Sequence, residues 1–158
     1  VKALKCDLIV TGPQGNRTVA ADDFFADIWT TVLDLDEILV EIRVPNPTSP
    51  HVGAYKKFRQ RASDWAMVGV AIDLETVDGT FGNASVVMTN MGNVPIRASQ
   101  VERVLAGQTI TRDVVHSAAE RAGEGTDPSS DLKASREYKL HLARVLTRRA
   151  LETALDLA

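Results

Sequence analysis

The sequence predicts an α+β fold, because its strand-like segments and its helix-like segments are grouped instead of alternating along the chain. In the second half, three segments rich in β-branched and apolar residues come first, and three segments with helical spacing follow. A stretch with three prolines in six residues, 45–50, separates this group from an earlier strand-rich part. We therefore expect a strand-rich first part, followed by a three- to four-stranded antiparallel sheet packed against three helices.

The composition is that of an ordinary globular protein, with 44% hydrophobic and 25% charged residues. The net charge of -3 gives no reason to expect binding to nucleic acid or to an anionic membrane. The single cysteine, Cys6, cannot form an internal disulfide, which favours a reducing cytoplasm. The longest apolar stretches, such as residues 67–74, fall short of the ~20 residues that span a bilayer, so we expect no transmembrane segment. The chain opens on Val1 and at once reads as a strand, so we expect an upstream part to be missing.

Before the prolines, the pattern predicts a hairpin, a short helix and one more strand. Strands over 3–10 and 17–20 flank a turn at 12–16, and the acidic start of segment 21–25 suits a helix N-terminus. The turn looks superficially like a phosphate-binding loop. No helix follows it to supply a positive dipole end, however, so we interpret it as a plain hairpin turn.

The strand expected over residues 37–44 has one leucine on a face that otherwise carries charged residues. Side chains alternate between the faces of a strand. One face is expected to carry four apolar residues: Ile38, Val40, Ile42 and Val44. Leu39 shares the other face with Glu41 and Arg43 and is its apolar exception. Such a residue either packs under a neighbour or contacts a ligand.

Beyond the prolines, we expect strands over 54–60, 67–75 and 82–90, with a hairpin turn at 77–80 before the last of them. The second strand is nearly all apolar in its first half, which is typical of a central strand.

Three helices are expected after these strands. The first covers 98–106 and ends near Gly107; the second is capped by Thr111 and ends near Gly123 or Gly125; the third covers 135 to about 157. The apolar stripe predicted for the third helix consists of Tyr138, Leu142, Val145, Leu146, Ala150 and Ala154.

The first of these strands is unusually basic, with four cations among residues 55–61. In strand geometry, Tyr55, Lys57, Arg59 and Arg61 share one face, and Lys56, Phe58 and Gln60 share the other. Aligned cations repel one another unless water, a carboxylate or an anionic partner lies opposite. Two interpretations stay open: a solvated edge strand protected by lysine, or a site for a negatively charged cofactor or acidic partner.

The motifs of common enzyme classes are absent from the sequence. The three histidines are scattered and accompany no cysteine or carboxylate cluster: His51, His116 and His141. We therefore expect no metal site. A free-standing enzyme acting through Tyr55, Asp64 or His141 has no support, because no spacing indicates a nucleophile with its base.

Several blocks of the sequence resemble the FAD-binding medium subunits of molybdenum hydroxylases. Residues 15–25 are similar to their Gly-x-Arg-x-Val-x-Ala-x-Asp-Phe-Phe segment, and residues 37–45 to their Glu-Ile-Leu-x-x-Ile-x-x-Pro strand. Residues 54–58 and 61–66 resemble the block that opens their C-terminal domain. Further matching blocks are 95–98, Glu102, 105–107, 127–131, Tyr138 and 144–151. The blocks keep the family's order from about residue 3 to residue 155.

This resemblance implies two domains: residues 1–46 as the C-terminal part of the second FAD-binding subdomain, and residues 51–158 as a CO dehydrogenase flavoprotein C-terminal-like domain. It also implies an oxidoreductase subunit that passes electrons from iron-sulfur clusters through FAD to an external acceptor. The 2Fe-2S clusters and the molybdenum cofactor are then expected on a small and a large partner subunit, and no catalytic residue on this chain. Asp64-Trp65-Ala66 favours the carbon monoxide dehydrogenase type, while xanthine, aldehyde and heterocycle hydroxylases remain alternatives.

The resemblance also identifies candidate FAD-binding residues. Leu39 matches the leucine that packs against the isoalloxazine ring, and Lys56 matches a lysine beside the flavin. Some relatives place that lysine one residue later, at Lys57, and Tyr55 belongs to the same block. Residues 61–64, which include Asp64, correspond to a loop that lies near the flavin in xanthine dehydrogenases. Ala62 and Ser63 stand where those relatives are more acidic, so no regulatory role is carried over.

The family's glycine-rich pyrophosphate loops lie upstream of every block matched by this chain. We therefore expect only a partial FAD site, without tight FAD binding by the chain alone and with an N-terminal FAD subdomain as a missing partner. An alternative from another class is a subunit-docking or assembly module with no cofactor contact. A cytoplasmic location is expected in either case, with the inner face of the membrane as a further alternative.

Overall fold

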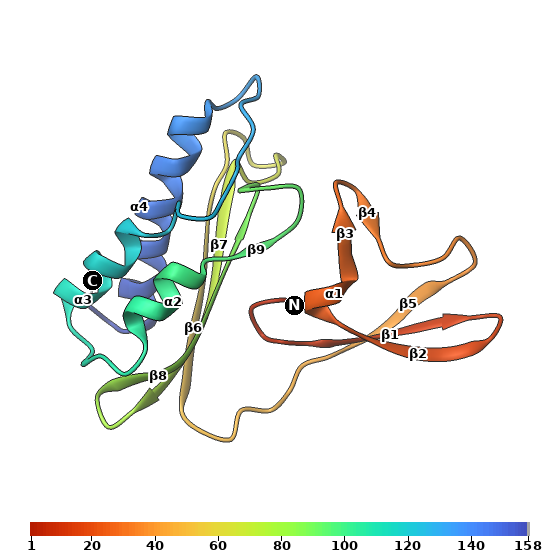
Figure 1. The fold of residues 1–158 in the computed structure, drawn as a ribbon, viewed down its shortest axis with the longest axis horizontal. Coiled ribbons are helices and arrows are strands. Elements are labelled where there is room, and N and C mark those ends of the chain that lie inside the picture. The colour runs from red at the N-terminus through yellow and green to blue at the C-terminus, as the bar shows by residue number, and fades with distance from the viewer. Residues whose placement is uncertain (158) are drawn as a thin grey trace. The chain divides into compact units, whose positions relative to one another are not determined.

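The computed structural model describes residues 1–157, which form two compact units. The first is Val1–Pro47, and the second begins at Thr48, so the boundary falls within the Pro-rich stretch. Antiparallel sheet structure occurs in each unit (Figure 1). Each unit also has a buried core of its own. Strands and helices are segregated in the second unit, which confirms the α+β class. No helix in the range 1–157 is both long and apolar enough to cross a bilayer.

The first unit is built on a three-stranded sheet with the strand order β2-β1-β5. A short helix and a two-stranded ribbon, β3-β4, lie between β2 and β5 in the sequence. The bounds are β1 (Asp7–Gly12), β2 (Gly15–Ala20), α1 (Ala21–Phe24), β3 (Phe25–Asp27), β4 (Thr30–Thr31) and β5 (Ile38–Arg43). The buried core of the described unit consists of Cys6, Leu8, Val10, Val19, Ala21 and Phe24. The sequence did not predict the ribbon, because its strands are too short to show alternation.

The predicted hairpin between the first two strands is confirmed, and its connection is tight. Gly12 lies opposite Gly15, so only two residues form the loop, and Gly15 has a φ of 103°, which favours glycine. A strand follows directly and no helix does, so this turn lacks the dipole end that a phosphate loop needs. The first strand begins later than predicted, at Asp7, because Lys5 adopts a φ of 49° in a preceding turn.

A β-bulge in β5 makes the predicted alternation of this strand wrong. Ile9 lies opposite Glu41, and the next residue, Val10, lies opposite Leu39. Val40 therefore has no counterpart on β1. Such an extra residue disrupts the regular exchange of faces along the bulged strand.

The bulge moves one isoleucine to the face of the leucine. Residues directly opposite each other in an antiparallel pair share a face. Leu39 and Ile42 lie opposite Val10 and Leu8, both of which are buried in the core. Ile42 thus shares the core-side face with Leu39 and not, as predicted, the face of Ile38.

The second unit contains a four-stranded antiparallel sheet with the order β6-β7-β8-β9. Its strands are β6 (His51–Phe58), β7 (Val68–Val77), β8 (Thr80–Thr89) and β9 (Ile96–Arg97). The predicted turn between β7 and β8 is confirmed, with positive φ at Asp78 (48°) and Gly79 (74°), as a two-residue hairpin requires. β9 has only two residues and was not predicted.

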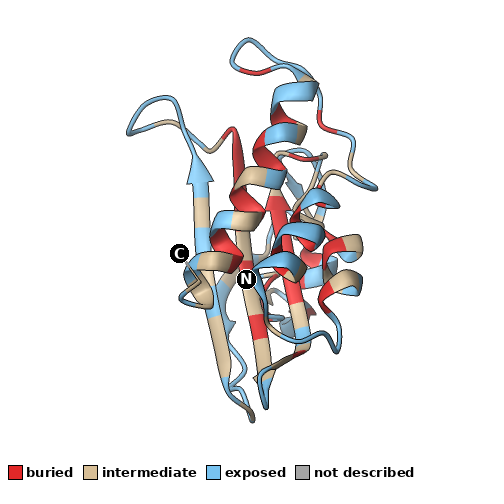
Figure 2. Cartoon of the chain, turned by 90° about the vertical axis from the view of Figure 1, so that its left-hand side faces the viewer, coloured by how far each residue is buried: buried red, intermediate tan, exposed pale blue. Residues whose placement is uncertain are grey.

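Three helices cover one face of this sheet: α2 (Ser99–Leu105), α3 (Arg112–Glu120) and α4 (Arg136–Ala154). α4 contacts β6 and β7, and α2 contacts β8. Figure 2 shows the buried residues of the helices on the side that faces the strands. The predicted capping is confirmed: the Thr111 hydroxyl accepts a hydrogen bond from the Val114 N–H, and Gly107 follows α2 with a φ of 69°.

The buried face of α4 is rotated from the predicted stripe. It consists of Lys139, Leu142, Ala143, Leu146, Thr147, Ala150 and Leu151. Tyr138, predicted to be part of the stripe, is 41% exposed, and Val145 is only half-buried. Leu142, Leu146 and Ala150 of the predicted stripe are buried, but a prediction from apolar residues alone misses Lys139 and Thr147.

Lys139 can be fully buried because its ammonium group has two partners. Its Nζ donates to the Ser129 carbonyl oxygen and to Asp131 Oδ2, each at 2.7 Å. The hydrogen bond from Lys139, together with the backbone N–H of Lys133, lowers the pKa of the Asp131 carboxyl to about 2. These contacts tie the loop before α4 to the helix itself.

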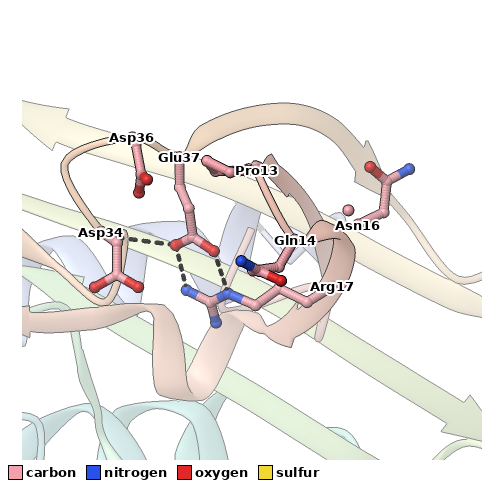
Figure 3. Close-up of a pocket in the computed structure, with 9 residues that line it drawn as sticks. Pro13, Gln14, Asn16, Arg17, Asp34, Asp36 and Glu37 are labelled. Atoms are coloured by element: carbon pink, nitrogen blue, oxygen red, sulfur yellow. Dashed lines mark hydrogen bonds and ion pairs between the residues drawn. The ribbon is translucent and has the colours of Figure 1, made fainter.

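In the first unit, one ion pair ties the β2 strand to the start of β5 (Figure 3). Arg17 donates from Nε and Nη2 to the two oxygens of Glu37, each at 2.7 Å, and also to the Val32 carbonyl at 2.8 Å. The hydrogen bonds from Arg17, together with the backbone N–H of Asp34, lower the pKa of the Glu37 carboxyl to about 2. The fork geometry of arginine suits this bidentate contact.

Replacing the buried lysine should destabilise the second unit. Lys139→Met keeps much of the volume but removes both hydrogen bonds of the ammonium group, so we expect a loss of about 1–3 kcal/mol in the free energy of unfolding. Urea denaturation measures this quantity. The control is Arg144→Met on the exposed side of the same helix, expected within about 0.5 kcal/mol of wild type. Equal stability of the two variants would contradict the role of Lys139.

The Arg17–Glu37 pair should be visible in an acid titration. Because the folded-state pKa of Glu37 lies below its ordinary value of 4.5, the stability that the pair contributes is complete above about pH 4.5 and is lost as the pH falls towards 2. Arg17→Gln should return the pKa of Glu37 towards its ordinary value, as measured by carbon-detected NMR. Arg43→Gln, which removes the partner of Glu41, is the matched control and should leave Glu37 unchanged. A wild-type midpoint near 4.5 would disprove the assignment.

Candidate functional site

The basic strand β6 forms one edge of the sheet and pairs with β7. Lys56 lies opposite Val70, and Phe58 lies opposite Val68. Both valines are fully buried in the core beneath the helices, so Lys56 and Phe58 are on the helix-covered face. An edge-to-face contact between the rings of Phe58 and Tyr138 of α4, with centroids 6.3 Å apart, agrees with this assignment.

Tyr55 and Lys57 occupy the opposite face of β6, and both are exposed. Their β7 partners are Ala71 and Gly69. A side-chain Cβ at Gly69 would lie 2.8 Å from the Tyr55 hydroxyl and 2.8 Å from the Thr89 hydroxyl. The absence of a side chain at Gly69 therefore makes room for the tyrosine, whose side chain stays 56% exposed.

The two lysines of β6 have no protein partner in the described chain. Neither ammonium group forms a hydrogen bond or an ion pair with any of residues 1–157. Arg59, in contrast, donates to the Ala62 carbonyl at 2.9 Å. The edge position agrees with a solvated strand, and an unpaired ammonium group on either face agrees with a site for an anion.

Asp64 is held by a contact inside the second unit. Its Oδ2 lies 3.0 Å from Nζ of Lys133, and the same ammonium group lies 5.1 Å from the centre of the Trp65 ring. The loop after β6 is thus tied to the loop before α4. Lys133 was not singled out from the sequence, because nothing in the sequence spacing pairs residues of two distant loops.

Leu39 belongs to the first unit, where it is half-buried and packs against the core. It lies opposite Val10 on β1. Leu39 is therefore on the core-side face, and the predicted placement on the face of Glu41 and Arg43 is wrong because of the bulge. The exposed remainder of the side chain is still accessible from outside the unit.

The structure brings some of the candidate residues together and separates others. Tyr55 and Lys57 share one face of β6, Lys56 lies on the other face, and Asp64 lies in the loop that follows. Leu39 is in the other unit. Because neighbouring residues of a strand point to opposite faces, Lys56 and Lys57 cannot present their charges to the same surface of the sheet.

The first unit has a pocket of about 240 Å³ next to the β1–β2 turn (Figure 3). It is lined by Gly12, Pro13, Gln14, Gly15, Asn16, Arg17, Asp34, Asp36 and Glu37. The guanidinium group of Arg17 is occupied by Glu37 and Val32, and three carboxylates line the pocket. An anion such as a phosphate would meet negative charge there, which agrees with a plain hairpin turn.

Within residues 1–157, no cluster of three or more His, Cys, Asp or Glu residues is arranged to hold a metal ion.

Comparisons with known proteins cover nearly the whole chain. The chain is 32% identical to the carbon monoxide dehydrogenase medium chain of Hydrogenophaga pseudoflava over 152 residues, which are 96% of this chain and 53% of that protein. It is 34% identical to the corresponding medium chain of Afipia carboxidovorans over 145 residues, 92% of this chain and 50% of that protein. The chain thus spans about half the length of these curated relatives.

Solved structures show the same similarity. Carbon monoxide dehydrogenase from Hydrogenophaga pseudoflava matches with a TM-score of 0.90 and 34% identity, covering 98% of this chain and 54% of that chain. Quinoline 2-oxidoreductase from Pseudomonas putida 86 matches with a TM-score of 0.89 and 28% identity, covering 99% and 54%. The family model of the CO dehydrogenase flavoprotein C-terminal domain matches residues 53–154. The chain therefore belongs to the CO dehydrogenase flavoprotein C-terminal domain family.

Proposed function

We propose that this chain is the C-terminal half of the FAD-binding subunit of a molybdenum hydroxylase of the carbon monoxide dehydrogenase type. In that role it helps to pass electrons from iron-sulfur clusters through FAD to an external acceptor. The observation that carries the proposal is the continuous match, through both units, to carbon monoxide dehydrogenase medium chains. The chemistry on the substrate then takes place on another polypeptide, and this chain has no catalytic residue.

The residues present fit a partial flavin site. When bound, FAD supplies the chemistry of electron acceptance and release. A flavin ring offers flat apolar surfaces and an edge on which negative charge accumulates. In the second unit, the exposed ring of Tyr55 can contact an apolar surface, and an unpaired lysine of β6 can favour negative charge. In the first unit, the exposed part of Leu39 can separately pack against an apolar surface. No glycine-rich pyrophosphate loop occurs in the sequence, so the site is partial.

The two lysines compete for the electrostatic role. The resemblance to other family members favours Lys56. The strand geometry supports Lys57, because Lys57 shares an exposed face with Tyr55, whereas Lys56 points to the face covered by the helices. For Asp64, the ion pair with Lys133 supports a positioning role in which the carboxylate orders the loop after β6.

The proposed partners are an iron-sulfur small subunit, a molybdenum large subunit and the upstream part of the FAD-binding subunit. The similarity of this chain to two kinds of enzyme supports the assignment of electron transfer and substrate chemistry to different subunits. Carbon monoxide dehydrogenase and quinoline 2-oxidoreductase match almost equally well in structure, although their names indicate very different substrates. The choice of substrate therefore lies outside this half of the flavoprotein.

A buried, unpaired Cys6 agrees with a cytoplasmic location.

The isolated chain should not retain FAD. Most of the affinity for a dinucleotide comes from backbone N–H groups around the pyrophosphate, and this chain lacks the glycine-rich loops that supply them. After incubation with FAD and gel filtration, the chain should elute colourless, as judged by absorbance of flavin in the protein peak. The complete medium chain of Hydrogenophaga pseudoflava, treated in parallel, is the positive control. A yellow protein peak from the isolated chain would overturn the expectation.

Replacement of the lysine that contacts the flavin, Lys56 or Lys57, should slow electron transfer in the complete complex. Loss of about 1.4 kcal/mol of charge stabilisation corresponds to about tenfold in rate, so we expect Lys56→Met or Lys57→Met to slow flavin reduction by about that factor or to shift its potential. Stopped-flow absorbance and redox titration measure the two effects, and each variant is the other's matched control. Unchanged kinetics and potential in both variants would contradict a flavin-facing role for β6. That result would favour the alternative, a docking module without cofactor contact.

A further inference from the structure

One end of the second unit, the basic end, is formed by residues 57–67 and 127–138 and carries exposed cations that no carboxylate answers. Lys57, Arg59 and Arg61 stand at alternate positions at the end of β6 and in the loop after it, and all three are exposed. Within residues 1–157 none of them forms an ion pair, and the guanidinium group of Arg59 donates only to the neutral carbonyl group of Ala62. The chain as a whole has a net charge of -3, so this positive charge is a local feature.

The basic end also exposes large apolar side chains. Trp65 is 68% exposed and Leu132 is 108% exposed, and the ammonium group of Lys133 lies 5.1 Å from the centre of the Trp65 ring. The rings of Phe58 and Tyr138, which contact each other, are 38% and 41% exposed. Figure 1 shows the loop after β6 and the loop before α4 at the same end of the sheet.

An apolar surface next to unanswered cations fits a protein partner that carries carboxylates. Exposed apolar side chains with a charged rim mark interaction sites, and tryptophan, tyrosine and arginine contribute most of the binding energy in protein interfaces. The ion pair between Lys133 and Asp64, at 3.0 Å, already orders the loop that carries Trp65, which lowers the entropy cost of binding. Carboxylates of a partner opposite Arg59 and Arg61 would complement the charge of this surface.

A flat anionic membrane fits the basic end less well than a protein does. The loop before α4 contains Asp127 and Asp131 on either side of the apolar and cationic groups. Although Asp127 is paired with Arg136, its side chain is 88% exposed. An extended layer of anionic lipid would meet these carboxylates as well as the cations, whereas a folded protein can place its own carboxylates opposite the arginines alone.

The exposure of the cations favours a partner that binds and leaves. Permanent subunit interfaces are large and apolar, whereas encounters between electron carriers are small and are guided by charge. Arg61 follows Lys57 by four residues, so it lies within about 14 Å of Lys57, the reach of an extended chain of that length. A partner on the basic end would therefore lie close to the lysine that is a candidate for facing the flavin.

We propose that the basic end is the docking surface for the external electron acceptor, and that this acceptor is an acidic electron-carrier protein. The inference rests on the proposed function and adds the chemical class of the acceptor. Two molecules of a one-electron carrier take up the two electrons that each reduced flavin delivers. No covalent bond forms, and the protons of the reduced flavin pass to the solvent.

Two charge forms of one carrier test the proposal in the complete complex. Native cytochrome c is basic, and succinylation of its lysines replaces their positive charges by carboxylates. The complex is reduced with dithionite, freed of excess reductant and mixed with either form, and stopped-flow absorbance of the haem gives the rate. At low ionic strength we expect the succinylated form to react about tenfold faster or more, and we expect added salt to remove the difference.

A pair of variants locates the docking surface. Arg59→Glu combined with Gln60→Glu should slow the reaction with succinylated cytochrome c by about tenfold and speed the reaction with the native form. The matched control is Gln108→Glu combined with Arg112→Glu, which makes the same change in charge at the other end of the sheet. There, the N–H of Ile110 donates to the Gly79 carbonyl of the β7–β8 hairpin. The control should keep the wild-type preference, and both variants should reduce menadione, a small uncharged quinone, at the wild-type rate.

The outcomes separate this inference from the proposed function. Equal rates with both cytochromes, in a complex that still reduces menadione, would overturn the acidic acceptor and leave electron transfer in place. Failure to reduce menadione and both cytochromes would overturn the proposed function and this inference with it.

Two further results would assign the basic end to another partner and thereby overturn the proposal. One is loss of the iron-sulfur subunit from the Arg59→Glu, Gln60→Glu variant in native mass spectrometry, which would make this end a permanent subunit contact. The other is binding of the wild-type complex, but not of this variant, to vesicles of phosphatidylglycerol without any preference between the two cytochromes.

Discussion

The burial of one face of β7 beneath the helices determines the arrangement of the whole second unit. Val68, Val70, Ile72 and Leu74 alternate along this central strand and are all buried in a single core. Because opposite residues of paired strands share a face, this burial also decides which side chains of β6 turn towards the helices. Lys56 is thereby directed to the covered face, and Tyr55 with Lys57 to the open one. The chemistry available at the edge of the sheet is thus a consequence of packing at its centre.

Polar contacts hold the second unit together where its apolar core ends. Lys139 reaches the loop before α4 through Ser129 and Asp131, and Lys133 of that loop reaches Asp64 and the Trp65 ring. These contacts connect α4 to the loop that follows the basic strand. Charged side chains that would be expected on the surface from the sequence therefore connect separate parts of the fold. The candidate residue Asp64 is one of these side chains.

The two units differ in the size of their buried cores. The second has a four-stranded sheet, three covering helices and a large core. The first has a small core and an exposed apolar edge, and its candidate ligand residue, Leu39, contributes to that core. A half-buried leucine of this kind can support the fold and offer its remaining surface to a neighbouring ring or polypeptide. The bulge explains why strict alternation assigned this leucine to a polar face, since the bulge turns Leu39 to the core side, away from Glu41 and Arg43.

The sequence by itself determined the α+β class, the two hairpin turns, the helix caps and the family, because each depends on local spacing or on ordered sequence blocks. Gly79 and Thr111 are examples in which a single residue type specifies the backbone around it. Only the tertiary structure decided the bulge at Val40, the short strand β9, the burial of Lys139 and the opposite faces of Lys56 and Lys57 relative to the helices. These features depend on contacts between residues far apart in the chain. A strand can be recognised from its own residues, but the face that is buried depends on the elements that pack against it.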